Sequence, residues 1–159
     1  MGEVFFYHMT QTPLEATLPT LVARSRERGW RVAIRARSDE RIAWLDDRLW
    51  LGDDAGFLPH GRAGGPFDAD QPVLLTTGAD IPNAAACLMA VDGAEVTADE
   101  VAALDRVCIL FDGADAAAVQ HARSQWRSLT TAGCAAKYWS QESGRWEQKA
   151  ESRGTTPDA

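Results

Sequence analysis

The sequence predicts an α/β fold of Rossmann-like type, with three layers, a mainly parallel sheet and no phosphate-binding loop. Two observations lead to this prediction. Five apolar runs of strand length alternate with helical patterns along the 159 residues, and parallel strands need crossover connections of this kind. The turn after the first run lacks the glycine signatures that cradle phosphate. One domain is expected over residues 1–150, followed by a frayed polar tail at 151–159.

The first strand and helix are predicted from the run EVFFYH and the pattern that follows it. The helical pattern places apolar residues on one face and stops at Gly29. Thr12 and Pro13 suit the N-cap and the first helical position, although Pro19 leaves open a start near Thr17.

The remaining elements continue the alternation. RVAIRA is the second strand, and Ser38 opens a helix whose apolar residues recur on one face: Ile42, Leu45 and Leu49. After a passage rich in Gly, Pro and Asp, three further strand runs read VLLTT, AACLMAVD and RVCILFD. A short helix is expected over Ala98 to Leu104, and a longer one from about Ala114 to Thr131, before Gly133.

Charge and hydropathy disfavour several classes of protein. The net charge is −7, and residues 51–118 alone contribute −10, with 2 basic against 12 acidic side chains. A dedicated nucleic-acid binder usually has a broad basic face, so direct DNA binding is disfavoured, although a local basic pocket stays open. No apolar run approaches the roughly 18 residues of a membrane helix, and the first residues lack signal-peptide character. A cytoplasmic location is therefore expected.

Patterns typical of catalysis or metal binding are scarce. Cys87, Cys108 and Cys134 are widely spaced in apolar surroundings and are predicted to be reduced core residues. The histidine spacing gives no metal motif, and GxSxG and Walker signatures are missing, so we expect neither catalysis nor a cofactor. His60 is the best lone candidate for acid–base chemistry, which leaves a small α/β enzyme or nucleotide-binding domain as the alternative.

The stretch RLWLGDDAGFLPHG, residues 48–61, combines loop residues with large apolar ones. Trp50, Leu51, Phe57 and Leu58 would be costly to leave in water, so something should cover them. Either they fold back onto the protein's own core, or a partner protein sits on them.

An ordered set of segments resembles the chi subunit family of bacterial DNA polymerase III: FFYH, RGWRVAIRA, DERIAWLDDRLW, FLPHG, PVLLTT, RVCILFDG, ARSQWRSLTTAGC and YW. The resemblance covers Val4 to about Trp139 and rests on order and spacing. It implies a small non-catalytic subunit of the polymerase holoenzyme. It also implies two partners, the psi subunit of the clamp loader and the C-terminal tail of single-stranded-DNA-binding protein, with DNA reached only through them. An adaptor for an accessory helicase is a further alternative.

The resemblance also implies where these partners bind. The residues that match the psi or helicase surface are Trp50, Phe57, Leu58, Pro59 and His60. Those that match the tail-binding pocket are Arg123, Trp126 and Arg127. Arginines four apart share a helix face, and guanidinium groups can grip a carboxylate in two-pronged fashion. A core role for Trp126 stays open, because it also falls in the apolar stripe of the same helix.

Overall fold

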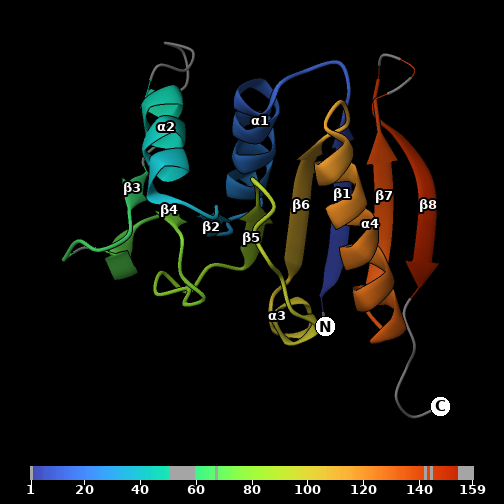
Figure 1. Ribbon diagram of the computed structural model, residues 1–159. Coiled ribbons are helices and arrows are strands. Elements are labelled where there is room, and N and C mark those ends of the chain that lie inside the picture. Colours follow the sequence, from blue (N-terminus) through green and yellow to red (C-terminus); the bar gives the residue numbers. More distant parts are fainter. Residues whose placement is uncertain (1, 51–59, 67, 142, 144, 154–159) are drawn as a thin grey trace.

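The protein is described from a computed structural model that covers residues 2–50, 60–66, 68–141, 143 and 145–153 (Figure 1). Its strands are β1 (Glu3–Met9), β2 (Val32–Arg35), β3 (Gly61–Arg62), β4 (Val73–Thr76), β5 (Cys87–Ala90), β6 (Arg106–Asp112), β7 (Ala135–Ser140) and β8 (Glu147–Arg153). Its helices are α1 (Leu14–Glu27), α2 (Asp39–Trp50), α3 (Ala98–Ala103) and α4 (Ala116–Thr131), with a 3-10 turn at Asp68–Asp70.

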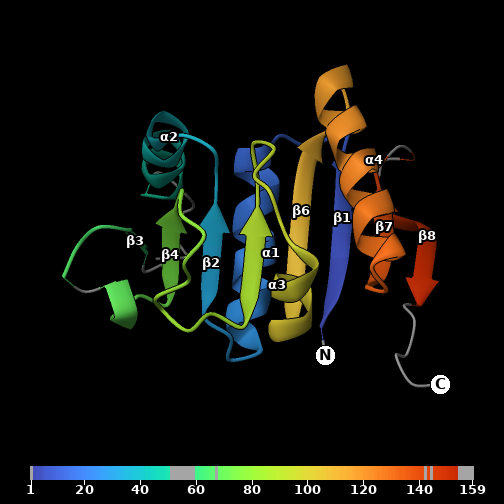
Figure 2. The same ribbon diagram turned by 60° about the horizontal axis from the view of Figure 1, so that its bottom comes forward.

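The strands form one sheet in the order β3-β4-β2-β5-β6-β1-β7-β8. Every neighbouring pair is parallel except β7 and β8, which are antiparallel. Helices cover both faces, and Figure 2 shows α4 on the near side of the sheet and α1 on the far side. The predicted α/β fold with three layers and a mainly parallel sheet is confirmed.

Each face of the sheet carries its own hydrophobic core. The core under α1 and α2 contains Leu18, Ile34, Leu45, Leu75 and Met89, all at most 1% exposed. The core under α3 and α4 is built from the alternate residues of the same strands, among them Val4, Phe6, Leu88, Val107 and Ile109. Because successive strand residues point to opposite faces, the strand runs read as continuously apolar in the sequence.

The ends of the helices follow from local chemistry. The α1 and α4 helices both end with a left-handed glycine, Gly29 (φ 83°) and Gly133 (φ 93°). In each case the amides of the glycine and of the next residue return to the last turn of the helix, an arrangement that satisfies otherwise unpaired carbonyls. The Ser38 hydroxyl accepts the Arg41 amide at 3.2 Å, which confirms that Ser38 opens α2.

The start of α1 differs from one of the sequence expectations. The helix begins at Leu14 and includes Pro19, so a start near Thr17 is wrong. Pro19 costs the helix one hydrogen bond, but the helix survives because its buried face packs on the sheet. Pro13 occupies the N-cap and supplies no side-chain bond, so Thr12 is not the cap.

The C-terminal strands were absent from the predicted elements. β7 is mostly partly buried, and β8 is a polar strand at the sheet edge, EQKAESR. Polar and charged residues are usual on an edge strand but give no apolar signal in the sequence. β8 continues to Arg153, so residues 151–153 are paired rather than frayed; residues 154–159 lie outside the described part of the chain.

Two smaller expectations can also be compared with the structure. Cys87 and Cys108 are buried and free, whereas Cys134 is free but only partly buried. None of the helices within the described ranges could cross a membrane.

Candidate partner-binding surfaces

The helix α4 presents one face to the core and the other to solvent. Asp115 caps its start by accepting the amides of Ala117 and Ala118 at 3.0 and 3.2 Å. Ala122 and Leu129 are 2% exposed and fix the buried face. The buried face packs on β6 and β7. This packing holds the opposite, solvent-exposed face in a defined position.

Trp126 is half-buried and packs between α4 and the sheet. Its ring lies 5.3 Å from the ring of Phe6 and 6.0 Å from that of Tyr138, both in edge-on geometry. The Tyr138 hydroxyl in turn forms a 2.7 Å hydrogen bond with His8 Nδ1. Trp126 is thus part of the core packing and also keeps an exposed edge beside the arginines of α4.

Arg123 and Arg127 are exposed on α4, one turn apart. The sequence of α4 contains no acidic residue. Neither guanidinium forms a salt bridge with any described residue. In a chain of net charge −7, this helix offers two uncompensated cations beside an aromatic edge.

The second predicted surface is only partly within the described residues. Trp50 is the last residue of α2, and Phe57, Leu58 and Pro59 lie outside the described ranges. His60 has a fully covered side chain, and its Nε2 lies 3.0 Å from Asp46 Oδ1. His60 therefore ties the start of β3 to α2, and its burial gives no support to the alternative in which it acts as an exposed acid or base.

The helix α2 carries an aromatic and basic cluster that the sequence analysis did not single out. The guanidinium carbons of Arg41 and Arg48 lie 4.1 and 5.1 Å from the ring centre of Trp44. Such stacking is typical of cation–π contacts. The i, i+3 and i+4 spacing of these residues around Trp44 was the available signal.

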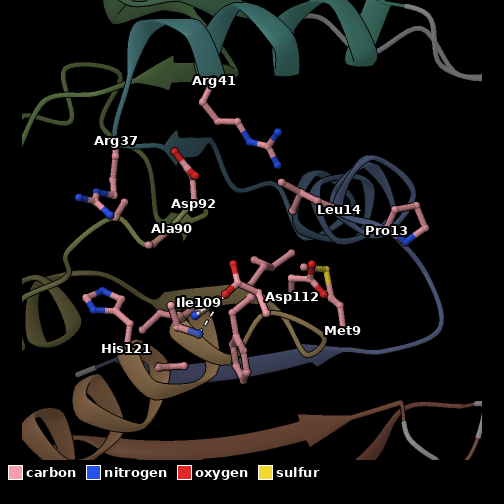
Figure 3. A pocket seen from close by; sticks show the side chains of 18 of the residues that line it. Met9, Pro13, Leu14, Arg37, Arg41, Ala90, Asp92, Ile109, Asp112 and His121 are labelled. Carbon is pink, nitrogen blue, oxygen red and sulfur yellow. Dashed lines mark hydrogen bonds between the residues drawn. The ribbon is translucent and has the colours of Figure 1, made fainter.

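A cavity of about 620 Å³ lies at the carboxyl ends of the parallel strands, between α1 and α4. In α/β folds this crevice is the usual place for a nucleotide. Figure 3 shows Arg37, Arg41 and Asp92 toward one side of it, with Asp112 and His121 across from them. The mixture of charges makes it a poor match for the multiple negative charges of a nucleotide phosphate group.

The loop after β1, where a phosphate would bind, is closed by the protein itself. Gln141 Oε1 accepts the amides of Thr10, Gln11 and Thr12 at 3.1, 3.2 and 3.4 Å. Gln141 Nε2 donates to the Thr12 hydroxyl at 2.9 Å, and Gln141 is 5% exposed. Backbone amides that hold phosphate in nucleotide-binding loops are therefore already occupied here. This agrees with the expectation of a fold without a phosphate-binding loop.

A buried arginine is the strongest polar feature of the described residues, and no pattern in the sequence pointed to it. Arg35, 6% exposed, donates to both carboxylate oxygens of Glu100 at 3.0 and 2.7 Å. It also donates to the carbonyls of Gly78, Ala79 and Glu95. Burial disfavours ionisation of Glu100, but the hydrogen bonds from Arg35 and Thr97 outweigh it and lower the pKa of Glu100. The ion pair joins β2 to α3 and to the loop after β4.

No group of His, Cys, Asp and Glu side chains within the described ranges is arranged to hold a metal ion. The mainly parallel sheet with helices on both faces is a doubly wound α/β domain. Its loop after β1 is closed by Gln141 and offers no site for a nucleotide phosphate. The chain belongs to the family described as DNA polymerase III chi subunit, HolC, whose sequence model matches residues 1–137. The predicted family is confirmed, and DNA replication is its process. No curated protein sequence matches the chain significantly.

Proposed function

We propose that this chi-family protein joins the clamp loader, through psi or an equivalent subunit, to the tail of single-stranded-DNA-binding protein, without chemistry of its own. The observation that carries the proposal is the exposed face of α4, where Arg123 and Arg127 flank Trp126 with no acidic residue on the helix. A subunit of this kind works in the cytoplasm, where the replication complex assembles.

The chemistry of this face matches an acidic tail that ends in an aromatic residue and a free carboxylate. The two guanidinium groups can bind carboxylates, and the edge of Trp126 offers an apolar contact for the terminal ring. Hydrogen bonds to charged groups contribute about 1.5–3 kcal/mol each. Two of them supply a large part of the roughly 8 kcal/mol that a micromolar complex requires.

The test is fluorescence anisotropy with a labelled peptide of that tail. Arg123→Ala and Arg127→Ala should each weaken binding, and higher salt should weaken it further, because exposed ion pairs are screened. Arg62→Ala is the matched control, since Arg62 is also exposed but lies on β3. Equal affinity for all four proteins, without salt dependence, would remove α4 as the tail-binding site.

For the clamp-loader side, we propose that Trp50, Phe57, Leu58 and Pro59 contact psi or a helicase, with His60 in a supporting role. The contact of His60 with Asp46 supports this arrangement, because it anchors the end of the segment to α2. An aromatic anchor typically loses about 2 kcal/mol or more of binding energy when truncated. Phe57→Ala should abolish capture of the clamp-loader subunit while the melting temperature stays nearly unchanged.

A pull-down from extract of the source cells, followed by mass spectrometry, compares the wild type with Phe57→Ala. Loss of clamp-loader subunits alone supports the proposal, and loss of a helicase alone favours the adaptor alternative. A large fall in melting temperature with capture intact would place Phe57 in the core and contradict the proposal.

A further inference from the structure

A second groove, of about 530 Å³, opens on the α1 side of the sheet. It lies between α1 and the strands β1 and β7, and Trp146 borders it just before β8. The side chains of β1 that reach this side are Phe5 and Tyr7, whereas Phe6 points to the α4 side. The groove and the arginines of α4 therefore lie on opposite faces of the sheet.

Aromatic rings form one wall of this groove. The ring of Trp139 lies 6.3 Å from that of Phe5, and the ring of Trp146 lies 5.3 Å from that of Tyr7, at 90° to it. Tyr7, Trp139 and Trp146 are all half-buried. Each therefore has partners that hold its ring in place and is still partly accessible to solvent.

Basic side chains form the other wall. Arg24 is exposed on α1, and Arg28 is exposed at the C-cap of the same helix. The guanidinium carbon of Arg106 lies 4.2 Å from the centre of the Phe5 ring. Glu27 is the acidic residue in the lining. Although the whole chain carries a charge of −7, the lining of this groove is basic.

Two hydrogen-bond donors among the lining residues lack acceptors. Arg106 Nε and Trp139 Nε1 are enclosed and have no hydrogen-bond partner among the described residues. Buried donors are normally paired.

We propose that this groove binds a short stretch of single-stranded DNA. Half-exposed rings that can stack on bases, next to cations that can follow phosphates, are the two elements by which proteins hold single strands without reading sequence. The volume of the groove falls in the range of small-ligand sites, so it holds only a few nucleotides. An acidic peptide would use the cations but has little need of several separate ring faces.

Part of the aromatic wall lies beyond the residues that the family model matches. Trp139 and Trp146 both follow residue 137, where the match to the chi family ends. The groove is thus completed by β7 and the segment leading into β8, not by the matched region alone.

The test uses the full chain and a labelled single-stranded oligothymidylate, followed by fluorescence anisotropy at several salt concentrations. We expect weak binding that the Arg24→Ala/Arg28→Ala double variant reduces at least severalfold. The slope of log affinity against log salt is negative, and its magnitude should decrease by about 1.4 when two phosphate contacts are lost. The Arg123→Ala/Arg127→Ala double variant is the matched control, because it removes the same charge from the opposite face.

Further arms identify the occupant. Thymidine monophosphate should compete poorly with the oligonucleotide, and duplex DNA of the same length should not bind. Trp139→Phe, which keeps a ring but removes the indole donor, should weaken binding less than Trp139→Ala. No binding of the oligonucleotide, equal loss in both double variants, or a preference of the groove for an acidic peptide would overturn the proposal. Binding of the tail peptide to α4 is measured separately, so the two proposals fail independently.

Discussion

Arginine serves opposite purposes in two regions of this protein. Arg35 is 6% exposed and satisfies its guanidinium with five hydrogen bonds, two of them to Glu100. Arg123 and Arg127 are exposed and have no salt bridge with any residue that the structure describes. The charge is the same, but the guanidinium of Arg35 is fully hydrogen-bonded within the fold, whereas those of Arg123 and Arg127 remain available to a ligand.

The difference shows why burial and partners must be considered together. A buried charge is tolerated only when its hydrogen bonds are made inside the protein, so its removal damages the fold. An exposed charge loses little on removal from the free protein, so its effect is expected in a complex. Stability and binding should therefore separate cleanly between these two regions.

The largest effect is expected for Arg35→Ala. It leaves Glu100 without its partner and three loop or turn carbonyls without their donor, and breaking a buried ion pair costs about 3–5 kcal/mol. Urea unfolding should show this loss in the free energy of unfolding. Arg62→Ala, at an exposed position, serves as the control. A loss below about 1 kcal/mol would mean that the Arg35 network does not secure the fold.

Trp126→Ala should reduce both stability and binding, because Trp126 packs on the sheet and is also partly exposed beside the arginines of α4. Its ring packs on Phe6 and Tyr138, so we expect a loss of about 2–3 kcal/mol in stability, below the value for a fully buried tryptophan. Binding of the acidic tail should weaken as well. Trp126→Phe should recover most of the stability and less of the binding. Full stability in Trp126→Ala would contradict its placement against the sheet.

The sequence could predict positions that repeat along a helix, such as that of Trp126. It could not predict a contact between residues far apart in the chain, such as that of Arg35 with Glu100. The repeat through Val119, Ala122, Trp126 and Leu129 placed Trp126 on the buried stripe of α4, and the structure keeps it partly in the core. Arg35, in contrast, appeared only as a polar residue at the end of an apolar run. Its partner Glu100 lies 65 residues further along the chain, and only the folded sheet brings the two together.

The same limit applies to the sheet itself. Strand runs with apolar residues on both faces were predicted, because burial on two sides leaves a continuous signal. The polar edge strand β8 and the partly exposed β7 were missed, since neither is apolar throughout. The position of Gln141 beneath the loop after β1 depends on how β7 ends, which no local pattern encodes.

Glu100→Gln should have a smaller effect than Arg35→Ala, with a defined dependence on pH. The pKa of Glu100 is lowered from its ordinary value of 4.5 in the folded protein, so its charge stabilises the fold above that value. This stabilisation is lost as the pH falls through the lowered pKa. At pH 7 the variant should be about 1–2 kcal/mol less stable than the wild type, because one charged hydrogen-bond partner is lost.

The measurement is urea unfolding of both proteins from pH 7 to pH 3. The gap between wild type and Glu100→Gln should be constant at neutral pH and should close on acidification below about 4.5. A gap that stays constant down to pH 3 would show that the carboxylate charge of Glu100 is not what the variant removes.

The smallest change in stability is expected for Arg123→Ala and Arg127→Ala. Both side chains are exposed and without ion pairs among the described residues, and substitutions of this kind usually stay within about 0.5 kcal/mol. The double variant should therefore unfold at nearly the wild-type urea concentration, at both low and high salt. If it instead unfolded as early as Arg35→Ala, these arginines would have to be bound within the fold, and the distinction between a buried, self-satisfied arginine and an available one would fail for this protein.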